Sequence, residues 1–76
     1  MIRFKLQERI SDKEFAEGRS VTLKEIAEAT GIHRVTLSKL ASHKLPNVGT
    51  EILDKLCDYF DCEIGGLAEH IKSQSK

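Results

Sequence analysis

One stretch of the chain, residues 22–40, constrains the fold more than any other. Thr22 is followed three residues later by Glu25, which is the spacing of a capping box at the start of a helix. Gly31 comes where this helix has to end, because glycine adopts the left-handed conformation at no steric cost. The stretch therefore predicts a short helix that begins after Thr22 and ends before Gly31.

A second short helix is predicted directly after this glycine. Leu37 and Leu40 are three residues apart, so a helix over residues 34–42 places both side chains on one face, against the first helix. Ala27 is small enough for the two helices to approach closely, and Gly31 lets the chain leave at a steep angle. This arrangement is that of a helix-turn-helix.

The small, apolar and glycine positions of the stretch are Ile26, Ala27, Gly31, Ile32, Leu37 and Leu40. Together they resemble the core signature of the Cro/repressor-like (Xre-like) helix-turn-helix family of bacteria and phages. The resemblance extends over about residues 4–72, because EILDKLCDYFDCEIGGLAEHI looks like the fourth and fifth helices of small family members. It implies an all-α, compact five-helix lambda-repressor-like DNA-binding domain over residues 1–72, with a flexible tail at residues 73–76.

The N-terminal part predicts a helix from about Lys5 to Glu17 that Gly18 ends. We expect Phe15 to pack inward near the end of this helix. A short strand remains an alternative for Ile2 to Leu6, because apolar and basic residues alternate there.

The C-terminal part predicts two further helices after the turn that contains Pro46, the only proline. The first is a core helix with an apolar face, made of Ile52, Leu53, Leu56, Cys57 and Phe60. The second is a shorter final helix with the apolar stripe Ile64, Leu67, Ala68 and Ile71. Gly65 and Gly66 weaken its start.

Charge is distributed unevenly, although the formal net charge is zero at pH 7. Residues 31–50 carry Arg34, Lys39 and Lys44 and no acidic residue, which points to double-stranded DNA as the partner. The helical wheel turns Val35, Ser38 and Lys39 away from the buried leucines. By resemblance, the base-contacting residues are Arg34, Val35, Ser38 and Lys39. Phosphate contacts are expected from residues at or near helix ends, namely Thr22, Lys24, His33, Thr36, His43 and Lys44.

Other chemistries have little support in the sequence. Cys57, Cys62 and His70 lack the spacing of common zinc sites, and the cysteines are expected to be reduced. No arrangement suggests a catalytic nucleophile, and no glycine-rich loop would hold a phosphate-bearing cofactor, so we predict neither enzyme activity nor a cofactor. No segment has the length and apolarity to span a membrane, or the pattern of a signal peptide, so a cytoplasmic location is expected.

These observations predict a sequence-specific transcriptional regulator, with repression by steric occlusion as the simplest mechanism. One recognition helix buries little surface on DNA, so a homodimer on a two-fold site is expected. Two alternatives remain. The chain is an antitoxin that also holds a toxin partner, which a neighbouring toxin gene would indicate, or it is a protein-interaction module of the same fold without DNA binding. A salt-dependent mobility shift separates the last alternative from the others.

Overall fold

A computed structural model describes residues 1–44 and 47–72 of the chain. Its elements in chain order are β1 (Ile2–Phe4), α1 (Leu6–Glu17), α2 (Leu23–Thr30), α3 (Arg34–Ala41), α4 (Thr50–Phe60), α5 (Ile64–Leu67) and β2 (Ala68–His70). Across the described residues the fold is therefore all-α, with five helices and one small two-stranded sheet. None of these helices combines the length and apolar composition needed to cross a bilayer. Pro46 and the expected tail at residues 73–76 lie outside the described residues.

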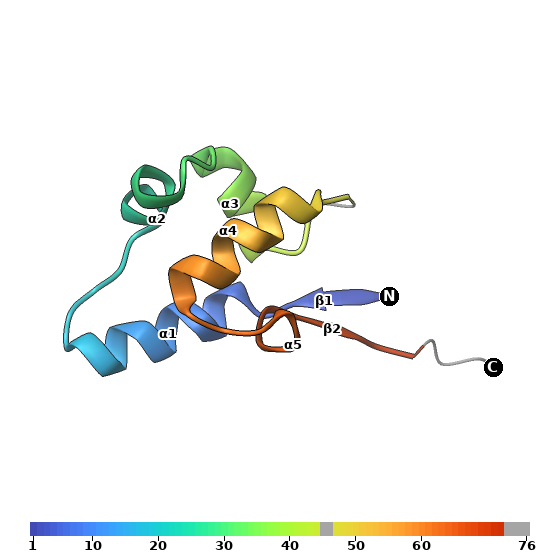
Figure 1. The fold of residues 1–76 in the computed structure, drawn as a ribbon, viewed down its shortest axis with the longest axis horizontal. Coiled ribbons are helices and arrows are strands. Elements are labelled where there is room, and N and C mark those ends of the chain that lie inside the picture. The colour runs from blue at the N-terminus through green and yellow to red at the C-terminus, as the bar shows by residue number, and fades with distance from the viewer. Residues whose placement is uncertain (45–46, 73–76) are drawn as a thin grey trace.

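Each helix contributes one or two apolar side chains to a common core. α4 packs against α2 and α5, and α1 packs against α3 and α5 (Figure 1). The buried residues of this core are Leu6, Val21, Ile26, Ile32, Leu37, Leu40, Leu56 and Leu67. The helix-turn-helix supplies half of them, namely Ile26, Ile32, Leu37 and Leu40. The site predicted from the sequence is therefore also a main part of the core.

α1 agrees with its predicted bounds but not with the predicted place of Phe15. Gly18 ends the helix with a φ of 66°, and its N–H donates to the Glu14 carbonyl at 2.8 Å. Phe15, however, is 92% exposed, so the expectation that it packs inward is wrong. Leu6 sets the buried side of α1, and Phe15 follows nine residues later, at about 180° around a helix with 100° per residue. The helical period therefore turns Phe15 to solvent.

The predicted final helix is wrong beyond Leu67. α5 ends at that residue, and Ala68–His70 forms strand β2, antiparallel to β1, with Ile2 opposite His70. Two successive glycines make a longer helix unfavourable there, whereas pairing with β1 satisfies the backbone of both segments. The short strand predicted as an alternative near the N-terminus is observed over Ile2–Phe4, directly before α1.

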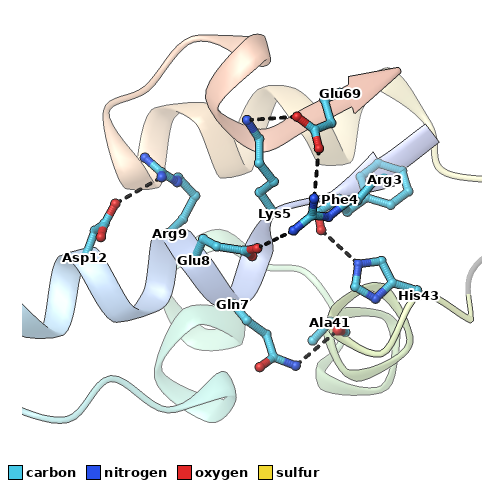
Figure 2. Close-up of polar contacts among 10 residues, drawn as sticks. All are labelled: Arg3, Phe4, Lys5, Gln7, Glu8, Arg9, Asp12, Ala41, His43 and Glu69. Atoms are coloured by element: carbon cyan, nitrogen blue, oxygen red, sulfur yellow. Dashed lines mark hydrogen bonds and ion pairs between the residues drawn. The ribbon is translucent and has the colours of Figure 1, made fainter. Parts of the chain in front are cut away.

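Polar contacts attach the sheet and the start of α1 to the end of α3 (Figure 2). The Gln7 side-chain amide donates to the Ala41 carbonyl at 3.1 Å. The His43 Nε2 lies 2.9 Å from the Phe4 carbonyl oxygen. Because Ala41 ends α3 and His43 follows it, these contacts fix the C-terminal end of α3 relative to β1 and α1.

Candidate nucleic-acid interface

α2 begins at the predicted cap. The Thr22 backbone is extended, and its hydroxyl accepts a hydrogen bond from the Glu25 N–H at 3.1 Å. The reciprocal half of the capping box is wrong, because the Glu25 carboxylate accepts from Arg19 instead, at 2.8 and 2.7 Å. The Arg19 hydrogen bond lowers the pKa of Glu25. The start of α2 is therefore held both by its cap and by the segment before it.

Replacing Thr22 with alanine tests the contribution of this cap. Thr22→Ala removes the acceptor for the Glu25 N–H, so the free energy of unfolding should fall by about 0.5–2 kcal/mol. Urea titration followed by circular dichroism measures the change. Thr50→Ala is a matched control at an exposed helix start, since the Thr50 hydroxyl makes no hydrogen bond among the described residues. Equal effects of the two substitutions would contradict a capping role for Thr22.

The turn between α2 and α3 satisfies its own backbone groups. Gly31 has a φ of 78°, and its N–H donates to the Ala27 carbonyl at 2.8 Å. The Thr30 hydroxyl donates to the Ile26 carbonyl at 2.7 Å and accepts from the Ile32 N–H at 3.2 Å. Only glycine adopts this backbone conformation without strain, so the predicted role of Gly31 is confirmed.

α3 lies against the core with the predicted face. Leu37 and Leu40 are fully buried. The side chains predicted to contact bases are all exposed, and they are Arg34, Val35, Ser38 and Lys39. Val35, the second residue of α3, is 64% exposed. His33, at the N-cap, makes no side-chain bond to the helix, so the first N–H groups of α3 have no side-chain cap.

Most basic side chains of the described chain form ion pairs, but those on α2, on α3 and just after α3 do not. Those that form ion pairs are Arg3, Lys5, Arg9, Lys13, Arg19 and Lys55. By contrast, within residues 1–44 and 47–72 no ion pair involves Lys24, Arg34, Lys39 or Lys44, nor Lys72 at the C-terminal end of the described chain. The unpaired charge of the helix-turn-helix is therefore available to an anionic partner, which the zero net charge of the chain conceals.

A shallow hollow of about 410 Å³ lies between α2 and the start of α3. Its lining residues are Lys24, Ala27, Glu28, Gly31, Ile32, His33 and Arg34. The hollow therefore brings together Lys24, His33 and Arg34, three of the residues that the sequence predicts to contact DNA. Glu28 was not anticipated there, although it lies four residues after Lys24 and so on the same helix face. Its carboxylate is the acidic group of this hollow.

The remaining predicted contacts lie elsewhere. Thr22 is exposed before α2, and Thr36 is half-buried in α3. Lys44 follows the far end of α3, where its N–H donates to the Lys39 carbonyl at 2.8 Å. His43 has a left-handed φ of 61°, and its ring is already engaged with β1. Of the predicted phosphate contacts, Lys24 and His33 therefore lie at the start of α3 and His43 and Lys44 at its end, whereas Thr22 lies at the start of α2.

A metal centre is not formed by the described residues, in which no three or more His, Cys, Asp and Glu side chains converge. Cys57 and Cys62 are free thiols and both are half-buried. The third side chain considered for zinc, His70, lies in β2.

Comparison with known proteins gives one match. The family model of the Cro/C1-type HTH DNA-binding domain matches residues 13–73. The match includes α2, the turn and α3, and it leaves β1 and the first half of α1 outside. No curated protein and no solved structure shows significant similarity to the chain.

Proposed function

Because the chain belongs to the family of Cro/C1-type helix-turn-helix DNA-binding domains, we propose that it is a sequence-specific repressor of transcription in the cytoplasm. In this proposal α3 enters the major groove, as the second helix of a helix-turn-helix does. Bound protein then blocks access to the DNA by steric occlusion. This mechanism requires no cofactor and no catalytic residue.

The observation that carries this proposal is the surface of α3 and its surroundings. Arg34 and Lys39 are exposed and have no ion pair in the described part of the chain. Lys39 lies on the side of α3 opposite the buried leucines, and Arg34 flanks that side in the first turn. Either can donate to guanine O6 and N7, and the exposed Val35 can contact a thymine methyl group. Lys24 and Lys44 lie at the two ends of the α2–α3 unit, where they can approach phosphates on either side of the groove.

Selection of bound sites from a random duplex pool tests the proposal. We expect enrichment of one motif, and binding to it that weakens as salt rises, because phosphate contacts release counterions. Mobility shifts on the selected site and on a scrambled duplex then give the specificity ratio. Equal affinity for both duplexes, or no binding at low salt, would overturn the proposal in favour of a protein-interaction module.

Lys44 separates phosphate contacts from base contacts. Lys44→Ala should weaken binding to all sequences alike and reduce the slope of log affinity against log salt by about one, because one phosphate contact is lost. The control is Lys55→Ala, since Lys55 lies on α4 and pairs with Glu51 at 3.8 Å. Salt titrations of both variants on selected and scrambled duplexes make the measurement. A loss confined to the selected site would assign Lys44 to base recognition instead.

We further propose that the protein binds DNA as a homodimer, because one eight-residue recognition helix buries little surface. The exposed apolar side chains Met1, Ile2 and Ile64 support the sheet end as the contact. They line a hollow of about 760 Å³ whose lining also includes Val48 and Leu53. Direct strand pairing between copies is less favoured. The Phe4 carbonyl lies on the edge of β1 that faces away from β2, and it already has a hydrogen-bond contact with the His43 ring.

A charge placed at the sheet end tests this assembly. Ile64→Asp should yield a folded monomer, because Ile64 is 54% exposed and begins α5, where an acidic residue is favourable. Phe15→Asp is the control. It makes the same kind of change at an exposed apolar residue near the C-terminal end of α1, away from the sheet. Light scattering with and without DNA measures the mass, and the selected motif should contain half-sites about 10 to 10.5 base pairs apart. A dimer that persists in Ile64→Asp would place the contact elsewhere.

A further inference from the structure

The C-terminal end of α4 brings two thiols together through its backbone. Asp61 has a left-handed φ of 52°, and the Cys62 N–H donates to the Cys57 carbonyl at 3.0 Å. This is the long-range hydrogen bond of a Schellman motif, in which the residue after the left-handed position contacts the residue five positions earlier. In most helices that contact is apolar. Here its two members are Cys57 and Cys62.

Burial and the pKa of Cys57 indicate that the two thiols lie close to each other. Both are half-buried and free. Burial is the main cause that raises the pKa of the Cys57 thiol, and the neighbouring Cys62 thiol raises it further. The backbone bond at the end of α4 thus makes the two thiols neighbours, and both are free in this structure.

Cys62 also borders a basic side chain. A Cβ placed on Gly66 would lie 3.7 Å from the Cys62 sulfur and 4.0 Å from Arg9 Nη1, so the thiol and the guanidinium flank the same small space. The Arg9 Nε–H is buried and has no acceptor in the described part of the chain, while Nη2 pairs with Asp12 at 3.0 Å.

From this arrangement we propose that Cys57 and Cys62 form a redox-active dithiol that closes to an intramolecular disulfide at the end of α4. The oxidant is a low-molecular-weight disulfide such as oxidised glutathione. The Cys62 thiolate attacks one of its sulfur atoms and releases one glutathione thiolate, which takes up the proton that Cys62 lost. The Cys57 thiolate then attacks the Cys62 sulfur of the mixed disulfide and releases the second glutathione. Two protein thiols are oxidised and one glutathione disulfide is reduced to two thiols.

The test uses the full chain, equilibrated without oxygen in glutathione buffers of increasing oxidised fraction. Samples are quenched in acid, alkylated and analysed as intact protein by mass spectrometry. We expect the doubly alkylated chain to convert to an unalkylated monomer that is lighter by two hydrogens. Because the folded chain holds the thiols together, their effective concentration should be at least about tenfold higher than in the same chain unfolded in guanidinium chloride.

Single substitutions establish the order of the two steps. Cys57→Ser should accumulate a mixed disulfide of Cys62 with glutathione, because the resolving thiol is absent. Cys62→Ser should react more slowly, because the remaining thiol is the one whose pKa is raised. Circular dichroism of both variants and of the oxidised chain confirms that the helices are retained. Equal effective concentrations in folded and unfolded chain, or oxidation only to glutathione adducts or covalent dimers, would overturn the proposal.

Discussion

Leu40→Ala should destabilise the domain enough to abolish DNA binding near physiological temperature. Leu40 is fully buried, and it belongs to the core cluster that joins α3 to the other helices. Emptying such a position costs about 2–5 kcal/mol, whereas a domain of 76 residues has a total stability of about 4–11 kcal/mol. The substitution therefore removes a large fraction of the stability and disorders the surface that would meet DNA.

Val35→Ala is the matched control for this prediction, because Val35 lies on the same helix but is 64% exposed. Its stability should change by no more than about 0.5 kcal/mol, although it removes the proposed contact with a thymine methyl group. Urea titrations of the two variants followed by circular dichroism make the comparison. A loss of stability in Leu40→Ala that is no larger than in Val35→Ala would show that α3 packs differently.

The elements that the sequence predicted well are those with local causes. The cap at Thr22 and the turn at Gly31 depend on residues within four positions of each other, and both are observed. The buried leucines of α3 follow from helical spacing alone. Such signals can be found in one sequence, because the groups that interact are close along the chain.

The errors have causes that the sequence shows poorly or that were given too little weight. β2 forms because Ala68–His70 meets Ile2–Phe4, a pairing between the two ends of the described chain that helical periodicity cannot reveal. Phe15 is a different case. Its spacing from Leu6 predicts an outward direction, whereas its apolar character alone predicts burial, and the structure agrees with the spacing. The helical period is therefore a better guide than hydrophobicity for a single residue in a short helix.

The sequence predicts which face of α3 is exposed, but it does not predict which basic side chains form ion pairs. Which side of α3 faces solvent follows from its two leucines, and the structure agrees. Which cations remain unpaired depends on tertiary contacts: Arg19 reaches Glu25 across the loop before α2, whereas the neighbouring Lys24 has no ion pair among the described residues. The acidic Glu28 beside Arg34 in the hollow is a further consequence of that packing.

Arg34→Ala and Lys39→Ala should each weaken binding to the selected site by about 1–3 kcal/mol and relax discrimination at one base pair, because each removes a donor to a base edge. Arg34 begins α3 and Lys39 lies in its last turn, so the two base pairs should differ. Neither side chain is buried or ion-paired within the described residues, so unfolding stability should stay within about 0.5 kcal/mol of the parent chain. Affinities for the selected duplex and for its single-base variants measure both effects.

The comparison with Lys55→Ala decides between specific recognition and general electrostatics. Lys55 carries the same charge but lies on α4, paired with Glu51, so its removal should leave discrimination unchanged. If Arg34→Ala and Lys39→Ala lose affinity equally for all duplexes, α3 contacts the backbone and sequence is read elsewhere. If both variants remain folded and bind the selected site as the parent chain does, α3 is not the recognition helix. The exposed face of α3 would then have to be explained by contact with a protein partner.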